Sequence, residues 1–458
     1  MLNWIERTRG MRTLALMGLM APALAAQSLS LPGSDPVSIG RAGAGVAYGR
    51  SLEAAGLNPA LLTTLTDPKS AFLGLGEEFQ SSQFSLQSNQ KTVYSTDRNR
   101  VVPSLGTAWR LGDRNVLGFR VDVPFLRHSQ FSEESSARFV GDELSLKTLR
   151  AEVQLARSFG HDGQFSFGVS AGMVKVDLVQ GTVVRALVGA TATLPVSGGN
   201  PSLGLVETRV TQQGTATMGT LAMGFRWALN PRWTLGGSAQ GYLKAAPSMT
   251  AAWGDRPSST VANDGFSTAP LGLNSSALLG ASNPVAGTGT LALPKSATVG
   301  IRQRVNNFFT WEADLRYLRM RNLALPGMPA LKTPSGTVGN GASVGALKDS
   351  MGLLVAGEAF LSSRWTLRGG FGLEKGFRED GDVEPLLGGA PTSNFSIGAG
   401  FKTWGGEWNF GYQVRLNRDQ ESSKLDGTWS STGYRSTGTL ARVEGMGHLF
   451  SIGFKKAF

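Results

Sequence analysis

The chain has 458 residues, 61 Gly, no Cys, 17% charged residues and a formal net charge of +11. Abundant Gly without a fixed repeat favours a large sheet with many tight turns, because helical proteins need more Ala, Leu, Glu and Lys. The basic residues are scattered along the sequence, which argues against a nucleic-acid-binding surface.

The first 25 residues have the features of a secretory leader. Three Arg precede an apolar stretch at 13–24, and Ala23-Leu24-Ala25 fits a small-x-small cleavage site. A single anchoring helix is the alternative, but the apolar stretch is shorter than a transmembrane helix and contains Pro22. We predict that residues 1–25 are a signal peptide.

Residues 26–66 are rich in small side chains and show no regular alternation. They include Asn58-Pro59-Ala60, and an Asn-Pro pair is ordinarily a turn signal. The segment is too short to build its own core, so we expect it to lie in the lumen of the structure that follows. Arg41 and Glu53 are expected to form solvated ion pairs there, each worth about 0–1 kcal/mol.

From residue 70 onward, apolar and polar residues alternate with a period of two. In residues 408–416, for example, Trp408, Phe410 and Tyr412 share one face while Asn409 and Arg415 lie on the other. The alternating segments are roughly 9–13 residues long, against about 5–6 for an ordinary strand. That length suits tilted strands that cross a bilayer.

Fourteen such segments are predicted, and the connections between them alternate in length. The segments begin near residues 70, 101, 115, 145, 164, 215, 232, 296, 308, 350, 364, 393, 406 and 447. The short turns are at 112–114, 230–231, 306–307, 362–363 and 405–406, and the long connections include 177–214, 246–294, 321–349 and 418–446. This asymmetry is typical of outer-membrane barrels. The sequence therefore predicts an all-β fold: a transmembrane antiparallel β-barrel of about 14 strands over residues 67–458, with an N-terminal plug over residues 26–66.

The chain ends in an alternating segment whose last residue is Phe458. A closing strand with a terminal aromatic residue resembles the signal by which outer-membrane barrels are recognised for assembly. A soluble β-sandwich that ends in a strand is the alternative, but it leaves the aromatic residues on the apolar faces unexplained.

The segment IGRAGAGVAYGRSLEAAGLNPALLTTL, residues 39–65, carries a family signature. Its Gly/Ala-rich run followed by Asn58-Pro59-Ala60 resembles the N-terminal plug of the FadL family (OMPP1/FadL/TodX), outer-membrane transporters for long-chain fatty acids and other hydrophobic compounds. The resemblance implies a fourteen-stranded barrel closed by a plug. It also implies that a hydrophobic ligand binds among the extracellular loops, then in the lumen, and leaves sideways through a kink in the third strand.

In this sequence the kink is expected at Pro124-Phe125-Leu126. Pro has no N–H for a ladder hydrogen bond, so pairing is weakened there. Leu126 stands where the family pattern leads us to expect Gly. The resemblance thus predicts a channel for hydrophobic compounds in the outer membrane of a Gram-negative cell, reached after removal of the signal peptide.

Arg316 and Lys244 are the candidates for binding a ligand carboxylate, because a basic side chain facing the lumen pairs well with an anion. A neutral hydrocarbon needs no such partner. The sequence leaves a fatty acid, an aromatic compound and an alkane open as the ligand.

Two other classes of protein compete with this interpretation. A general diffusion porin or a structural barrel has no N-terminal domain of about forty residues before its first strand. An outer-membrane enzyme is suggested by the G-x-S-x-G matches at residues 168–172 and 341–345, but neither match has a strand–turn–helix setting. We therefore expect no enzyme.

We also expect no cofactor and no metal site, since the only His, at 128, 161 and 448, are far apart in the sequence and Cys is absent. The expected partners are a hydrophobic small-molecule ligand and outer-membrane lipid, without nucleic acid. The protein is expected to be a monomer.

Overall fold

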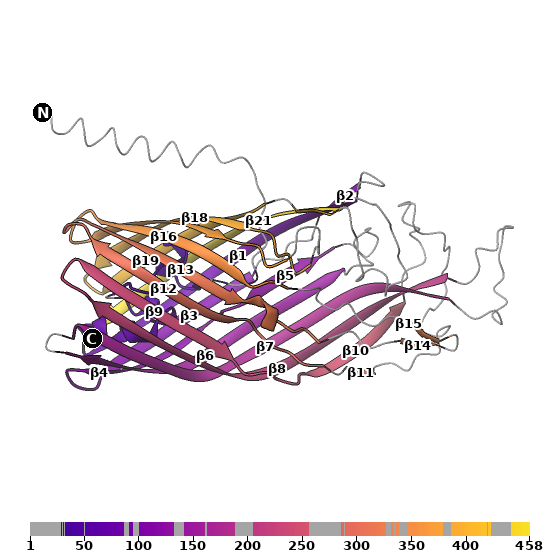
Figure 1. Ribbon diagram of the computed structural model, residues 1–458, viewed down its shortest axis with the longest axis horizontal. Coiled ribbons are helices and arrows are strands. Elements are labelled where there is room, and N and C mark those ends of the chain that lie inside the picture. The colour runs from indigo at the N-terminus through magenta and orange to yellow at the C-terminus, as the bar shows by residue number, and fades with distance from the viewer. Residues whose placement is uncertain are drawn as a thin grey trace, which may run out of the picture.

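The computed structural model is a closed barrel of fourteen antiparallel strands (Figure 1). It describes residues 29, 31, 33–49, 51–86, 91–94, 100–131, 142–160, 163–187, 205–255, 285–287, 289–326, 331–333, 336–338, 347–378, 386–418, 420–422 and 441–458. The barrel strands are β1 (Lys69–Leu86), β3 (Arg100–Arg110), β4 (Asn115–Asp122), β6 (Glu143–Phe159), β7 (Phe165–Leu187), β8 (Leu205–Ala228), β9 (Trp233–Tyr242), β12 (Lys295–Arg304), β13 (Phe309–Arg319), β16 (Ser350–Phe360), β17 (Trp365–Glu374), β18 (Thr392–Thr403), β19 (Gly406–Asn417) and β21 (Ala441–Ala457). Strands β1 and β21 pair, with Leu75 opposite Ile452, and this closes the sheet. The predicted fold is confirmed.

Shorter elements complete the structure. Strand β2 (Lys91–Tyr94) pairs with β1, β5 (Leu126–Gln130) with β6, β10 (Ser248–Asp255) with β8, β11 (Val285–Gly287) with β10 and β20 (Gln420–Ser422) with β21; β14 (Leu331–Thr333) and β15 (Gly336–Val338) form a hairpin. The helices are α2 (Pro36–Ile39), η1 (Glu53–Gly56), η2 (Pro59–Thr64) and η4 (Met320–Asn322). In the part of the chain that the structure describes, no helix is both long and apolar enough to cross a membrane.

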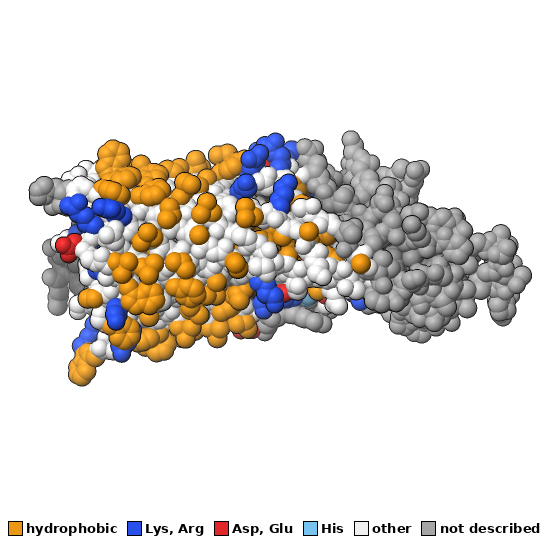
Figure 2. All heavy atoms as spheres, turned by 90° about the horizontal axis from the view of Figure 1, so that it is seen from below, with side chains coloured by type: hydrophobic (Ala, Val, Ile, Leu, Met, Phe, Trp, Pro, Cys, Tyr) orange, Lys and Arg blue, Asp and Glu red, His pale blue; other side chains and the backbone are white. Residues whose placement is uncertain are grey.

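The alternation in the sequence becomes an apolar outer face and a polar inner face. Leu73 and Ile397 are 64% and 66% exposed on the outside, whereas Glu312 and Asp314 are 0% and 1% exposed in the lumen. On the face that Figure 2 shows, the hydrophobic side chains form a belt across the barrel, with Lys and Arg at both of its edges. A belt about 25 Å tall is what lipid contact requires of such a barrel.

The predicted short turns lie together at one end of the barrel, and three of them use the same hydrogen-bond pattern. The side-chain oxygens of Asn230, Asn306 and Ser362 each accept hydrogen bonds from the backbone N–H groups two and three residues later. Asn and Ser favour turns for this reason. Gly112 has φ of +99°, a conformation that suits Gly.

Most strands begin within two residues of the predicted positions, but the predicted lengths were wrong for several strands. Strands β7 and β8 have 23 and 24 residues, so part of the stretch 177–214 that was predicted as a long connection is a strand pair. The strand β10 likewise lies inside the predicted connection 246–294. These extensions continue beyond the apolar belt, where no lipid imposes an apolar face and the alternation is weaker.

The N-terminal segment, residues 33–66, lies inside the barrel. Helix α2 packs against β18, β19 and β21, while η2 packs against β6, β7 and β8 on another part of the wall. Asp35 caps α2 by accepting a hydrogen bond from the Ser38 N–H at 2.8 Å. The barrel itself begins at Lys69. The proposed signal peptide, residues 1–25, lies outside the described residues.

Candidate functional site

Buried polar contacts fasten the N-terminal segment to strand β13. The Arg41 guanidinium pairs with the Glu312 carboxylate at 2.6 Å, and both side chains are almost fully buried. The Asp314 carboxylate accepts hydrogen bonds from the backbone N–H groups of Gly45 and Val46 at 2.7 and 3.1 Å. The expectation of a solvated Arg41 pair was therefore wrong. Separating a buried pair leaves an uncompensated charge and costs about 3–5 kcal/mol, so this part of the segment is firmly held.

A second set of contacts joins the segment to strand β4. Arg120 donates to Asp35 at 3.2 Å, to Asp122 at 2.8 Å and to the Glu53 carbonyl oxygen at 2.5 Å. Asp122 also accepts two hydrogen bonds from Arg150 at 2.6 and 2.7 Å. A continuous charged network therefore holds the barrel wall at the end of β4.

Asn58 has three hydrogen bonds that account for its place in the sequence. Its side-chain NH₂ donates to the carbonyl oxygens of Val46 and Phe225, at 2.7 and 2.8 Å. Its side-chain oxygen accepts from the Ala60 N–H at 3.0 Å and caps η2, in which Pro59 occupies the first turn. One residue thus starts a helix, binds a second stretch of the segment and binds the barrel wall.

Glycines in the barrel wall let the backbone of the segment approach closely. A Cβ on Gly224 would lie 2.0 Å from the Asn58 side-chain oxygen, and one on Gly168 would lie 2.5 Å from the Ala60 nitrogen. Any side chain at these two positions would displace the segment. Part of the Gly content, which the sequence assigned to turns, therefore serves docking of the segment.

The third strand is broken between β4 and β5, and both halves pair with β6. Asp122 lies opposite Arg150 and Leu126 lies opposite Lys147, so three residues, 123–125, face only two, 148 and 149. This is a bulge of one residue. The Thr148 hydroxyl accepts from the Phe125 N–H at 2.9 Å and donates to the Phe125 carbonyl at 2.6 Å, which satisfies the interrupted backbone.

The break leaves a gap in pairing between β3 and β5. Residues 100–104 of β3 pair with β1, and β3 meets β4 only from Leu105 onward. Within the described residues, the ladder partner of β5 is β6. Of the three predicted kink residues, Pro124 and Phe125 lie in the break and Leu126 begins β5, where it is fully buried.

Residues 29 and 31 cover the break from inside. The Leu31 N–H donates to the Pro124 carbonyl at 3.0 Å, and the Leu126 N–H donates to the Leu29 carbonyl at 3.2 Å. Both Leu side chains are buried. We call residues 29 and 31 together the strap. It holds the broken strand by two backbone hydrogen bonds, whereas charged and polar side chains fix the rest of the segment.

A large apolar cluster fills the lumen on the side of the long connections. It is formed by inward side chains of the strands together with connecting segments that fold over them. We call it the loop-side cluster; it contains Leu29, Phe125, Phe131, Leu144, Leu146, Val174, Val176, Leu178, Ala216, Met218, Tyr242, Met249, Leu291, Leu293, Leu318, Met320, Leu323, Phe377, Leu386 and Leu387. The cluster places a continuous apolar surface inside an otherwise polar lumen.

An exposed ion pair fixes the helix η4 that borders this cluster. Arg321 donates two hydrogen bonds to the Asp349 carboxylate, at 2.6 and 3.0 Å. These hydrogen bonds hold the pKa of Asp349 at about 2, so the carboxylate stays ionised at any ordinary pH. The neighbouring Met320 is thereby kept in the loop-side cluster.

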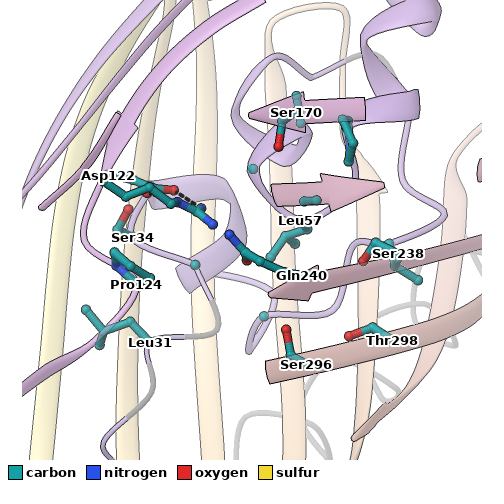
Figure 3. Close-up of a pocket in the computed structure, with 18 of the residues that line it drawn as sticks. Leu31, Ser34, Leu57, Asp122, Pro124, Ser170, Ser238, Gln240, Ser296 and Thr298 are labelled. Carbon is teal, nitrogen blue, oxygen red and sulfur yellow. Dashed lines mark hydrogen bonds and ion pairs between the residues drawn. The ribbon is translucent and has the colours of Figure 1, made fainter. Parts of the chain in front are cut away.

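A small polar cavity of about 90 Å³ lies between the loop-side cluster, the N-terminal segment and the break. Figure 3 shows Leu31, Asp122 and Pro124 on one side of it and Ser238, Ser296 and Thr298 on the other. The cavity has room for several water molecules at about 10–15 Å³ each. In this conformation it is too small for a long acyl chain.

The two predicted carboxylate-binding residues lie in different settings. Arg316 lines the polar cavity and pairs with Glu374 at 3.4 Å. Lys244 is exposed in the connection after β9 and is not among the residues that line the cavity. The structure does not bring these two side chains together in that cavity.

The sequence did not predict the strap, Thr148 or the loop-side cluster. The cluster has a partial sequence signal, since positions such as Leu144, Leu146, Val174 and Val176 are apolar on the face that points into the lumen. The strap has no such signal in the sequence, because its hydrogen bonds to the broken strand are made by backbone atoms.

These features define a class: an outer-membrane β-barrel with an occupied lumen and a broken third strand. The family model for the outer membrane protein transport protein family (OMPP1/FadL/TodX) matches residues 18–458, so the chain belongs to this family. Its members transport hydrophobic compounds across the outer membrane, and the chain is accordingly a transport protein and not an enzyme.

Solved structures share the fold at low sequence identity. A FadL homologue from Pseudomonas aeruginosa is 16% identical with a TM-score of 0.74, over 94% of this chain and 100% of that one. The toluene transporter TodX from Pseudomonas putida is 14% identical with a TM-score of 0.67, over 93% and 99%. The toluene transporter TbuX from Ralstonia pickettii is 17% identical with a TM-score of 0.60, over 93% and 99%. No curated protein matches the sequence.

Proposed function

We propose that the protein binds a hydrophobic compound in the loop-side cluster and releases it sideways through the break between β3 and β5. The observation that carries this proposal is the position of Phe125. It belongs to the loop-side cluster, lines the polar cavity and lies in the break. Its ring meets Tyr242 edge-on, with 5.5 Å between the ring centroids. The apolar surface of the binding site is therefore continuous with the proposed exit.

The energetics favour a lateral exit over a route through the N-terminal segment. Each CH₂ that leaves an apolar site for water loses about 0.8 kcal/mol. Arg120 and Asp314 line the cavity, and Glu312 lies in the lumen wall; all three are paired or hydrogen-bonded. A hydrophobic ligand that moves from Phe125 into lipid avoids both water and these charges.

The N-terminal segment serves as the plug of this barrel in our proposal, and the strap is its movable part. The charged contacts of Arg41 and Arg120 keep the plug in place. The strap must break two backbone hydrogen bonds to uncover the exit, which costs only about 0.5–1.5 kcal/mol each. The binding energy of a ligand that displaces the Leu29 side chain can supply this free energy.

We propose both fatty acids and aromatic hydrocarbons as candidate ligands. The similar structures are named as a FadL homologue and as toluene transporters. For an acid, Arg316 is the proposed carboxylate partner because it lines the cavity, and binding would compete with Glu374. Lys244 remains a prediction for the outer loop region. Pairing of β1 with β21 closes the barrel, so the gap in its wall is the break between β3 and β5, and the closed sheet is in keeping with the expected monomer.

A disulfide between the strap and the broken strand tests this function. The chain has no Cys, so Leu29→Cys with Leu126→Cys introduces the only thiols. Oxidation should stop the uptake of radiolabelled oleate and toluene by cells that depend on this protein, because the strap can no longer leave the exit. Reduction should restore uptake.

The matched control is Leu75→Cys with Ile452→Cys, a cross-strand pair that joins β1 to β21 away from the break. Oxidation of this pair should leave uptake unchanged. If the oxidised strap variant still takes up both compounds at the normal rate, release does not require movement of the strap and the proposed exit is wrong.

A further inference from the structure

A second and larger cavity opens at the short-turn end of the barrel, below the N-terminal segment. We call it the short-turn chamber; its volume is about 940 Å³. Its inner wall is the underside of the segment, with Tyr48, Thr63 and Thr64, and its mouth is formed by turn residues such as Arg114 and Asn307. The proposed route of the hydrophobic ligand does not use it.

The lining of the chamber is strongly basic. Nine Lys or Arg side chains and three Asp or Glu side chains line it, a formal excess of six positive charges. Arg368 already engages two of the three acidic residues, Glu358 at 2.9 Å and Glu407 at 3.5 Å. Lys455 also lies 3.9 Å from Glu407, so nine basic side chains share three carboxylates and the lining keeps its positive excess.

Arg302 is the clearest of these residues. Its guanidinium lies 5.2 Å from the centre of the Tyr48 ring, and its Nε is buried without a hydrogen-bond partner among the described residues. Leaving a buried charged donor unsatisfied is costly. Arg110, by comparison, donates to main-chain oxygens of Leu65 and Asp113, which fix its position but carry no formal charge.

The width of the chamber is close to the distance over which physiological salt screens charge, so charges on opposite walls act on one another. A volume of 940 Å³ corresponds to a width of about 10 Å, close to the Debye length of about 8 Å at physiological ionic strength. Counterions must therefore enter the chamber. The hydroxyls of Thr66, Ser158 and Thr234 add neutral polar groups to the same wall, whereas those of Ser51, Thr63 and Thr64 donate within the protein.

From this arrangement we infer that the short-turn chamber is a binding site for small multivalent oxyanions, such as phosphate compounds or polycarboxylates. Several guanidinium groups and hydroxyls around one space suit clustered anionic oxygens, because charge-assisted hydrogen bonds to Arg are the strong ones. A multivalent anion offsets several repelling charges at once, whereas chloride offsets one. The site faces the periplasm and is separate from the hydrophobic site above the plug.

Calorimetric titration of the full-length protein in detergent micelles tests this inference, with pyrophosphate and citrate as probes and chloride as the reference. We expect saturable binding of both probes, weakened by added NaCl, and none for chloride at equal concentration. Arg302→Gln with Arg304→Gln should weaken binding by about tenfold or more, since two charge-assisted hydrogen-bond donors are lost.

The matched control is Arg364→Gln with Lys456→Gln. This variant also removes two positive charges at the short-turn end of the barrel. Arg364 and Lys456, however, do not line the chamber. This control should bind the probes normally. Arg304→Gln alone, at an exposed position, keeps the test valid if the double variant misfolds. Equal loss in both double variants, or binding of an acidic peptide without binding of the small probes, would overturn the inference.

Discussion

Deletion of Pro124 is expected to abolish uptake of hydrophobic compounds while the barrel still folds. Residues 123–125 face only residues 148 and 149, so removal of one residue brings the two strands into continuous register. The new strand can then pair with β3 along residues 100–104, which closes the proposed exit. Uptake of radiolabelled oleate and toluene into cells that lack other transporters measures the effect.

Pro124→Ala is the control for this deletion. It restores a backbone N–H but keeps the extra residue, so the bulge and the exit should persist and uptake should stay near normal. Both variants should show the gel shift on heating that marks a folded barrel. Normal uptake by the folded deletion variant would contradict a lateral route at this break.

Removal of residues 26–66 is expected to convert the closed barrel into an open pore. The segment contacts β6, β7, β8, β13, β18, β19 and β21 from inside the lumen, and its removal also takes Leu29 out of the loop-side cluster, so an aqueous path is expected to open. Glu312 and Asp314 lose their partners but become solvated, so the barrel does not retain buried unpaired charges. Single-channel conductance in planar bilayers should rise strongly above that of the intact protein.

A point variant distinguishes removal of the N-terminal segment from a weaker attachment of the segment to the barrel wall. Asn58→Ala removes the η2 cap and two hydrogen bonds but leaves the segment in the lumen. It should cause at most brief, small openings. Equal conductance of the intact protein and the deletion variant would show that residues 26–66 do not close the pore.

The strand pattern of this chain could be predicted because lipid imposes a simple rule. Every membrane-facing position must be apolar and every second residue faces the lumen, so residues such as Trp408, Phe410 and Tyr412 mark a strand without tertiary information. Beyond the apolar belt the rule fails. The ends of β7 and β8 were therefore predicted as connections.

The break could be predicted in part, since Pro124 cannot donate a ladder hydrogen bond. The extra residue in the break could not be predicted, because the register depends on which residues of β6 pair with β4 and with β5. The residues that the N-terminal segment contacts could not be predicted from the sequence either. Arg41 and Glu312 are 271 positions apart, and only the closed barrel brings them together.

The Asn-Pro-Ala tripeptide of the family signature shows the difference between a motif and its structural role. Asn58-Pro59-Ala60 predicts a turn from sequence alone. The structure shows that Asn58 caps a helix and binds the barrel at Phe225, while Ala60 lies against Gly168 where a larger side chain would have no room. The motif therefore fixes the segment to the wall.

The central claim is that a hydrophobic ligand moves from the loop-side cluster to the break and into lipid. An oleate analogue with a photoreactive diazirine on its chain tests it directly when labelled residues are identified by mass spectrometry. We predict labels in the loop-side cluster, at residues such as Met218 and Phe131, and at Phe125 and Leu126 in the break. Labels on Thr63, Thr66 or Arg302 in the short-turn chamber, with none at the break, would contradict lateral release.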